Sequence, residues 1–266
     1  MPKRKIQPET REDAMSDNYW FIKKCNLFSH LSSADVSGLE SRSRMRKLKR
    51  GEPVYLPHED ADGIILVAEG RVKICHTTPD GKQSILGFVD SGEIFGELSL
   101  VSDQPRNEYA ETTEKTTLVL LPKRDLMLVA QKYPSIGLGV SKLIGVRRQR
   151  VERRLRNLLF RSNRERLIHL LLELTEKYGA RVEEGVQLGI RLSHQDMASI
   201  IGSTRETVTV VLGQLQAEDL LTISRRRLKL TNLEALAKEV NEACPLLPEE
   251  KATTEVSAIP NLSPNF

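Results

Sequence analysis

The sequence predicts an α+β fold in which an antiparallel β domain is followed by one long helix and a small winged helix-turn-helix domain. Three observations predict it: short runs of Val, Ile and Leu between glycines over residues 27–122, apolar residues at helical spacing over residues 135–160, and two short amphipathic segments joined by Gly202. The chain of 266 residues is 39% hydrophobic, which supports real cores and excludes wholesale disorder.

The β domain is predicted from its glycines and turns. Glycines recur at the spacing of strands and turns in an all-β sandwich or barrel, at Gly51, Gly63, Gly70, Gly81, Gly92 and Gly96. Residues 79–81 read Pro-Asp-Gly and predict a tight hairpin turn, because glycine adopts a positive φ easily. Residues 64–68 and 71–74 flank Glu69-Gly70 and predict a second hairpin.

The long helix is predicted over residues 135–160. Its apolar residues repeat at steps of three, four or seven, at Val140, Ile144, Val151, Leu155 and Leu158. A narrow apolar stripe on an otherwise polar helix needs a partner surface, and a second copy of the same helix would give a two-fold dimer. The alternative is that the stripe packs on the β domain of its own chain.

Basic residues are concentrated at the end of this helix and just after it. Nine arginines and only two glutamates lie between Gly145 and Arg166. A run of like charges is usually a solvated helix face, and attraction of phosphates or of an anionic effector is the other interpretation. The formal net charge of the whole chain is only +4, so a nucleic-acid site must arise from clustering of this kind.

The C-terminal domain contains three helix starts with capping signatures. Ser162–Glu165 has the spacing of a capping box, and an apolar face follows at Leu167, Leu170, Leu171 and Leu174. Ser193–Asp196 starts a second helix, with Met197, Ile200 and Ile201 inward, and Gly202 ends it. Ser203–Glu206 starts a third helix, with inward residues Val208, Val211, Leu212 and Leu215. Two short amphipathic helices joined by a tight glycine turn form a helix-turn-helix.

The outward face of the third helix predicts DNA recognition. Residues off its apolar stripe are candidates for base contacts: Arg205, Glu206, Thr209 and Val210. Arginine bonds guanine O6 and N7 together, glutamate accepts from cytosine N4, and valine contacts a thymine methyl. Short polar groups around them are candidates for phosphate contacts: Ser193, Gln195, Thr204 and Thr207. The alternative is that Arg205 and Glu206 form a surface pair, with Glu206 merely closing the cap on Ser203.

Residues 220–230 predict the wing. Two short β runs surround three adjacent arginines, Arg225, Arg226 and Arg227. Arginines gathered at a hairpin tip indicate contact with an anion. We therefore expect all three to bind DNA phosphates and to make affinity depend steeply on salt.

The order β domain, long helix, winged helix-turn-helix resembles the family of bacterial transcription regulators that contains the cyclic-AMP receptor protein and FNR (Crp/Fnr). The resemblance covers residues 27–240 and implies an antiparallel β-roll of the jelly-roll, cyclic-nucleotide-binding-like type, a dimerisation helix and a winged helix-turn-helix. A second signature, Gly92–Leu100 followed by Gln104–Ala110, is similar to the phosphate-binding cassette of that family. The matching positions imply an effector site formed by Gly96, Glu97, Leu98, Arg106, Asn107, Val151 and Glu152.

Some residues of this cassette fit the binding of a cyclic nucleotide, and others do not. Gly96 lets the backbone approach an anion, Arg106 can neutralise it, and Glu97 matches the carboxylate that holds a ribose hydroxyl. Nucleotide-binding relatives follow the arginine with Ser or Thr and then a small residue, whereas this chain has Asn107 and Glu108. Val151 and Glu152 stand where hydroxyl residues meet the adenine in the cyclic-AMP receptor. These departures argue against cyclic AMP, so the cofactor stays unknown: another small ligand or an empty pocket.

Other branches of the family suggest different sensors. The iron–sulfur branch needs several N-terminal thiolates, and Cys25 is the one cysteine in that region. Cys75-His76 resembles a metal or haem ligand pair, but adjacent residues on a strand point to opposite faces. We therefore expect no metal site. In the recognition helix, Val210 replaces an arginine that relatives often carry, so the half-site should match the usual one only in part.

We therefore expect a homodimeric, sequence-specific DNA-binding transcription regulator that is not an enzyme. A small effector between the β domain and the helix pair would alter a hinge near residues 160–162 and set two recognition helices about one DNA turn apart. The resemblance implies RNA polymerase as a partner. The alternative is a small-molecule-binding signalling module that acts on a protein partner. An enzyme is disfavoured because the sequence has no Ser-His-Asp set, metal-ligand spacing or Walker loop.

The predicted boundaries are a disordered tail over residues 1–16, an effector-binding domain over 17–133, a dimerisation helix and hinge over 134–161, a DNA-binding domain over 162–240 and a second disordered tail over 241–266. Three distant cysteines suit a reducing cytosol. The apolar runs are far below the roughly 18 residues that span a bilayer, and no secretory signal is recognised, so we expect a cytoplasmic protein without a membrane partner.

Overall fold

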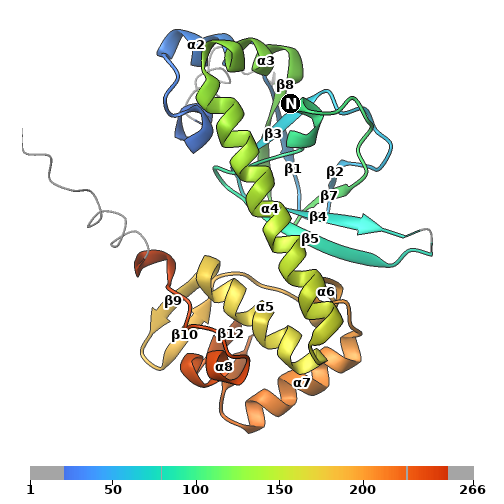
Figure 1. Ribbon diagram of the computed structural model, residues 1–266, viewed down its shortest axis with the longest axis vertical. Helices are drawn as coiled ribbons and strands as arrows, with labels where there is room; N and C mark the ends of the chain where they lie inside the picture. The colour runs from blue at the N-terminus through green and yellow to red at the C-terminus, as the bar shows by residue number, and fades with distance from the viewer. Residues whose placement is uncertain (1–20, 79, 226, 251–266) are drawn as a thin grey trace, which may run out of the picture. The chain divides into compact units, whose positions relative to one another are not determined.

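The computed structural model describes residues 21–78, 80–225 and 227–250. The chain forms two compact units, residues 1–150 and 151–266, and each is treated separately below. Figure 1 shows the order of the elements along the chain. The expected tail over residues 1–16 lies outside the described residues. None of the helices in the described ranges is long and apolar enough to cross a membrane.

The first unit contains two four-stranded antiparallel sheets in its described part, as the β-roll prediction required. One sheet has the order β1-β8-β3-β6 and the other the order β2-β7-β4-β5. The strands are β1 (Arg44–Leu48), β2 (Pro53–Tyr55), β3 (Gly63–Glu69), β4 (Arg71–Thr77), β5 (Gln83–Asp90), β6 (Ile94–Phe95), β7 (Tyr109–Thr112) and β8 (Thr116–Pro122). The helical segments are η1 (Asn26–Phe28), α2 (Ser33–Glu40), η2 (Glu97–Leu100), α3 (Lys123–Lys132) and α4 (Pro134–Phe160).

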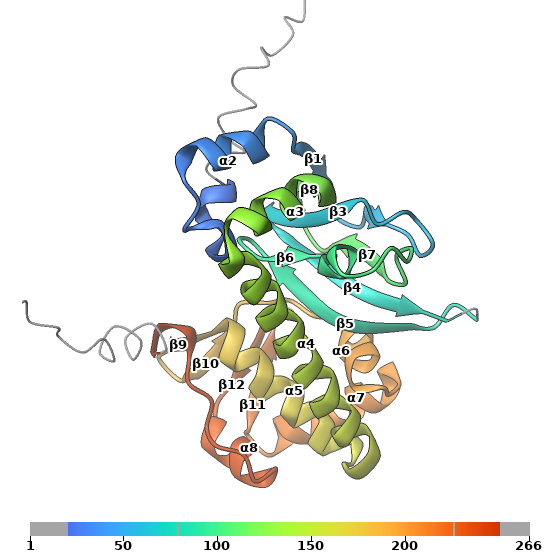
Figure 2. The ribbon, with the colours of Figure 1, turned by 45° about the horizontal axis from the view of Figure 1, so that its top comes forward.

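Strand β3 explains why this unit has two cores. Its side chains alternate, so Ile65 and Val67 face the second sheet while Ile64 and Leu66 face the helices. The core between the sheets includes Val72, Phe95 and Leu118, and the other core joins β3 and β8 to α2, α3 and the start of α4. Figure 2 shows α2, α3 and the beginning of α4 gathered on one side of the strands. A strand buried on both faces reads as a continuous apolar run, as residues 64–68 do.

The predicted hairpin around Glu69-Gly70 is wrong. β3 pairs with β6 and β8, whereas β4 pairs with β5 and β7, so the chain passes from one sheet to the other at this point. Gly70 makes the corner with a φ of 87°, and a Cβ there would lie 2.5 Å from the carbonyl oxygen of Lys115. The turn predicted at residues 79–81 does connect β4 to β5, with Gly81 at a φ of 81°, while Pro79 lies outside the described residues.

The apolar stripe on α4 differs between its two halves: the first half confirms packing on the chain's own β domain, and for the second half the dimer stays a prediction. Val140 is buried in the helical core of the first unit, and Ile144 packs against it, so this half does cover its own β domain. In the second half, Val151 and Leu155 are each 53% exposed and Leu158 is 49% exposed. Among the described residues these three side chains thus keep about half of their surface exposed, although a Cβ at Gly202 would lie 3.0 Å from Leu158 Cδ1.

The second unit is a winged helix-turn-helix, as predicted. Its elements are α5 (Asn163–Tyr178), β9 (Gly179–Val182), β10 (Gly185–Leu188), α6 (His194–Ile201), α7 (Arg205–Ala217), β11 (Leu221–Ser224), β12 (Arg227–Leu230) and α8 (Leu233–Glu239). The antiparallel sheet has the order β11-β12-β10-β9, so the wing hairpin β11–β12 extends a sheet whose other two strands, β9 and β10, were not predicted. The capping boxes at Ser162 and Ser193 are both present. The third helix begins one residue later than predicted, because Thr204 and not Ser203 is its N-cap.

The chain after α8 differs from the predicted tail. Residues 241–250 are described, and Leu247 is only 2% exposed. A Cβ at Gly179 would lie 2.9 Å from Leu247 Cδ2, and Glu250 forms a 2.6 Å ion pair with Arg181. One apolar anchor and one ion pair thus tie this segment to β9, and residues 251–266 lie outside the described residues.

Candidate functional site

The turn between α6 and α7 is fixed by its backbone and by one arginine of α5. Gly202 closes α6 in the left-handed region at a φ of 65°. Arg166 Nη1 donates to the carbonyl oxygens of Ile201 at 2.9 Å and Gly202 at 3.4 Å, while its Nη2 donates to Asn163 Oδ1 at 2.7 Å. These bonds satisfy carbonyls that the end of a helix leaves open. From the sequence Arg166 was expected only as one of the basic residues after the long helix, so this positioning role was not predicted.

The outward face of α7 is as predicted. Val208, Val211, Leu212 and Leu215 are buried, whereas Arg205, Glu206, Thr209 and Val210 are exposed. Within the described part of the chain, the side chains of Arg205 and Glu206 form no hydrogen bond or ion pair. The cap belongs to Thr204, whose hydroxyl oxygen accepts from the backbone N–H of Thr207 at 3.2 Å. The alternative of a surface pair with Glu206 closing the cap therefore fails, and both charged groups remain available to a ligand.

Thr209 differs from the other candidate base contacts because its hydroxyl already has two partners. The hydroxyl donates to the carbonyl oxygen of Arg205 at 2.9 Å, and His194 Nδ1 lies 2.7 Å from Thr209 Oγ1. Only its methyl group is therefore unconstrained. His194 was not among the predicted site residues, because a histidine at the start of α6 carries no signal in sequence that it reaches α7.

The predicted phosphate contacts are unequal. Ser193 donates its hydroxyl proton to Asp196 Oδ2 at 2.6 Å within the capping box, so it has none left for a phosphate. The hydroxyls of Thr204 and Thr207 lie 3.0 Å apart and share one proton between them, which leaves the second free to point outward. Gln195 is exposed, and its amide makes one 3.4 Å contact with the hydroxyl of Ser199.

The wing presents arginines at its tip. Arg225 occupies the left-handed region at a φ of 49°, and it and Arg227 are exposed. Among the described residues neither of these two side chains has a hydrogen-bond or ion-pair partner. Arg226 lies outside the described residues. By contrast, Lys229 further along β12 pairs with Glu184 at 2.9 Å, so the unneutralised charge lies at the tip.

The cassette holds Arg106 by internal contacts. This side chain is 8% exposed and donates to the carbonyl oxygens of Gly96 at 3.1 Å and Gly63 at 2.6 Å. Its guanidinium carbon also lies 4.7 Å from the ring centroid of Tyr55. Gly96 adopts a φ of 74°, and a Cβ there would collide with Arg106 Nη1. The left-handed backbone favours glycine at this position, and a side chain there would displace the guanidinium of Arg106.

The carboxylates near Arg106 also have partners. Glu97 is 5% exposed and forms an ion pair with Arg147 of α4, which also donates to the carbonyl oxygen of Ile94 at 2.6 Å. Glu108 accepts a 3.2 Å hydrogen bond from the hydroxyl of Tyr55. Burial and the charge of Glu108 raise the pKa of Tyr55 above its ordinary value, so the tyrosine stays neutral and donates.

The remaining predicted effector residues are exposed. Asn107 and Leu98 flank the buried pair of Arg106 and Glu97, and Leu98 is 52% exposed. Val151 and Glu152 lie on α4 within the second unit and are exposed as well. The structure therefore brings Gly96, Glu97 and Arg106 together and adds Arg147 and Tyr55, which sequence reasoning missed.

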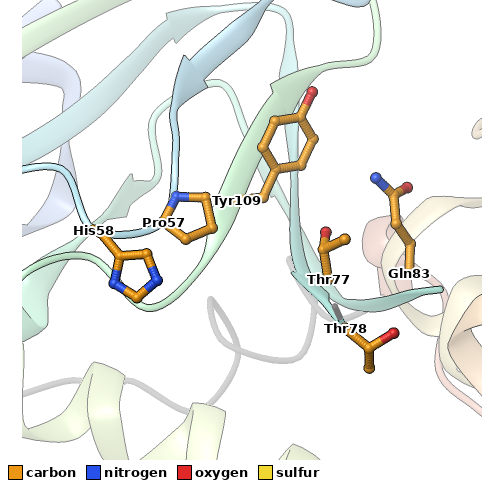
Figure 3. Close-up of a pocket in the computed structure, with 6 residues that line it drawn as sticks. All are labelled: Pro57, His58, Thr77, Thr78, Gln83 and Tyr109. Atoms are coloured by element: carbon orange, nitrogen blue, oxygen red, sulfur yellow. The ribbon is translucent and has the colours of Figure 1, made fainter. Parts of the chain in front are cut away.

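A separate hollow of about 460 Å³ lies beside the β4–β5 hairpin (Figure 3). It is lined by Pro57, His58, Thr77, Thr78, Gln83 and Tyr109, so it includes neither Arg106 nor Glu97. Tyr109 donates to Glu111 at 2.7 Å, and burial together with this carboxylate raises the pKa of Tyr109 to about 12. The hollow thus offers hydroxyl, amide and imidazole groups.

The side chains of Cys75 and His76 lie in different environments. Cys75 is buried and His76 is exposed, as expected for neighbours on a strand. Across the described ranges, no three His, Cys, Asp or Glu side chains come together as metal ligands.

Comparison with known proteins agrees with this architecture in both units. The family model of the cyclic nucleotide-binding domain matches residues 45–133, and that of the Crp-like helix-turn-helix domain matches residues 165–239. The chain belongs to the Crp/Fnr family of transcription regulators. This family consists of regulators rather than enzymes.

Relatives of the Crp/Fnr family match most of the chain. The global nitrogen regulator of Synechocystis is 27% identical over 71% of this chain and 85% of its own length. The cyclic AMP receptor protein of Thermus thermophilus is 27% identical over 76% of this chain and 90% of its own length. A solved CooA mutant from Carboxydothermus hydrogenoformans superposes with a TM-score of 0.67 over 79% of this chain and 91% of that one, at 22% identity, which shows the shared fold.

Proposed function

We propose that two copies of this chain bind a two-fold symmetric DNA site, with the start of α7 from each copy in the major groove. The observation that carries the proposal is the pair Arg205 and Glu206, which are exposed at the start of α7 and lack partners among the described residues. Arginine and glutamate in this position suit a guanine and a cytosine. Val210, which is 59% exposed, suits a thymine methyl, and Thr209 offers its methyl rather than its hydroxyl.

Phosphate contacts support this orientation. The wing arginines Arg225 and Arg227, with Arg226 between them, would neutralise phosphates beside the groove. The hydroxyl proton of Thr204 or Thr207 that is not used between the two threonines, and the exposed amide of Gln195, would add neutral donors. Ser193 is left out of this set because its proton belongs to the capping box.

The second half of α4 supports the dimer. Val151, Leu155 and Leu158 recur on one face of the helix and are about half exposed. A second copy of this helix would cover the stripe of each protomer. Recognition helices related by that two-fold axis would read half-sites about 34–36 Å apart.

The cassette supports a role in regulation but argues against cyclic AMP. A cyclic phosphate at Gly96 would have to draw Arg106 from two carbonyl oxygens, and Glu108 would bring a like charge close to it. Because Arg147 links Glu97 to α4, a ligand that takes either partner would alter how α4 packs. We therefore propose control by an effector other than cyclic AMP, and calorimetry of the full-length protein with cyclic AMP should show no micromolar binding.

The family supports RNA polymerase as a further partner and the cytoplasm as the place of action, where the chromosome is accessible. DNA selection followed by fluorescence anisotropy tests the central proposal. Arg205→Ala should weaken binding by about 1–3 kcal/mol and relax one base position in each half-site. Arg227→Ala should weaken binding to all DNA sequences alike. It should also reduce the salt slope by the value of about one phosphate contact per half-site.

The control is Arg124→Ala, which removes an exposed arginine on α3 in the other unit. It should leave affinity and salt slope unchanged. If Arg205→Ala keeps wild-type affinity and base preference at moderate salt, the assignment of α7 as the recognition helix is wrong.

A further inference from the structure

His194 lies against the face of α7 that is proposed to enter the major groove. It is the first residue of α6, is half-buried, and its Nδ1 lies 2.7 Å from Thr209 Oγ1. Thr209 is one turn after Arg205 on the same exposed face. A side chain from the first helix of the motif is therefore attached to the reading surface of the second.

The proton on this hydrogen bond can be placed from the neighbouring one. Thr209 has a single hydroxyl proton and donates it to the carbonyl oxygen of Arg205 at 2.9 Å. Both bonds form together only if His194 Nδ1 carries a proton and donates to Thr209 Oγ1. The remaining ring nitrogen, Nε2, is then an acceptor in the neutral imidazole and becomes a donor only when a second proton binds.

The first helix of a helix-turn-helix crosses the sugar–phosphate backbone, so phosphate oxygens come close to residues at its start. A phosphate oxygen accepts hydrogen bonds and carries negative charge, so it favours the doubly protonated ring. The charged residues at the ends of the elements around His194 are Asp196 in the first turn of α6, Arg205 and Glu206 in the first turn of α7, and Arg166 of α5, which contacts the far end of α6. Carboxylates and arginines do not change charge between about pH 6 and about pH 8, whereas imidazole does.

We propose that His194 is part of the DNA interface. When duplex DNA binds, the His194 of each bound protomer takes up one proton on its Nε2. The inference rests on the proposed DNA-binding function and adds a pH dependence to it. Affinity then rises as pH falls, because binding consumes a proton. The ring stays in place through its bond to Thr209, so protonation adds a phosphate contact without moving α7.

The test measures DNA affinity and salt slope of the full-length protein at about pH 6 and about pH 8, on the duplex recovered by selection. Wild type should bind about threefold to tenfold more tightly per half-site at the lower pH. Its salt slope should be steeper there by about 0.9 per half-site, the value of one phosphate contact. His194→Gln, which can still donate to Thr209 but cannot gain charge, should lose both effects. His194→Arg should bind at both pH values with the salt slope that wild type shows at low pH.

His169→Gln is the matched control, because His169 is the other histidine of the second unit. It should keep the full pH effect. The inference is overturned if His194→Gln retains the wild-type pH dependence, if His169→Gln removes it, or if calorimetry in buffers of different ionisation enthalpy detects no proton uptake. If the wild-type protein binds its site but its salt slope does not depend on His194, this inference alone is refuted. If the wild-type protein selects no duplex, the DNA-binding proposal is refuted as well.

Discussion

Leu155→Ala gives a quantitative test of the dimer. Leu155 lies in the second half of α4 and is 53% exposed, so a dimer partner can bury about half of its side chain. Full burial of a leucine is worth about 1.5–3 kcal/mol, and truncation also leaves a cavity. About 1–1.5 kcal/mol is therefore lost per copy. A two-fold interface counts the change twice, which gives about 2–3 kcal/mol and a dimer dissociation constant raised roughly 30- to 150-fold.

Sedimentation equilibrium over a range of protein concentrations measures this dissociation constant directly. Alanine is a strong helix former, so circular dichroism should show α4 intact. Leu138→Ala is the matched control: it removes the same side chain from the same helix, at a position that is 73% exposed and off the stripe. The reasoning fails if Leu155→Ala dimerises as tightly as wild type, or if Leu138→Ala weakens the dimer to the same degree.

Two further predictions concern the second unit. Arg166→Met should lower the free energy of unfolding by about 1–3 kcal/mol, because carbonyls at the end of α6 lose their donor, and DNA affinity should fall with it; urea denaturation and anisotropy measure both. Unchanged stability would remove Arg166 from its positioning role. Burial lowers the pKa of His169, so the folded chain binds fewer protons than the unfolded one and stability falls as pH drops below about 6.5. His169→Gln should reduce the fall of Tm at acid pH. If Tm of the variant falls as much as that of wild type, other groups cause the acid destabilisation.

The parts of the fold that follow from local chemistry could be predicted. Ser162 and Ser193 carry capping boxes because the required side chains lie three residues apart, and the sequence displays that spacing directly. The position of Gly202 ends α6 for an equally local reason, since its left-handed conformation favours glycine. The short amphipathic helices of the DNA-binding unit were therefore visible without a structure, apart from a one-residue shift at Thr204.

Features that depend on distant residues could not be predicted. Residues on both sides of Gly70 look like a hairpin, but the corner depends on β8 and β5, which pair with the two flanking strands. Leu247 looks like part of a polar tail until β9 provides the surface that covers it. The ion pair of Glu97 with Arg147 joins residues 50 positions apart, so the sequence could suggest Glu97 for a ribose but not its existing partner.

Electrostatics distinguishes the two candidate sites more sharply than sequence similarity does. In the cassette, Arg106, Glu97 and Glu108 all have partners within the chain, so a ligand must replace existing bonds. At the start of α7 and at the tip of the wing, Arg205, Glu206, Arg225 and Arg227 are exposed and have none among the described residues. Unpaired charge on a rigid helix is ready for a charged ligand, because binding requires no internal bond to break. A ligand of the proposed DNA face thus needs to break no bond among the described residues, whereas a ligand of the proposed effector site must displace contacts of Arg106 or Glu97.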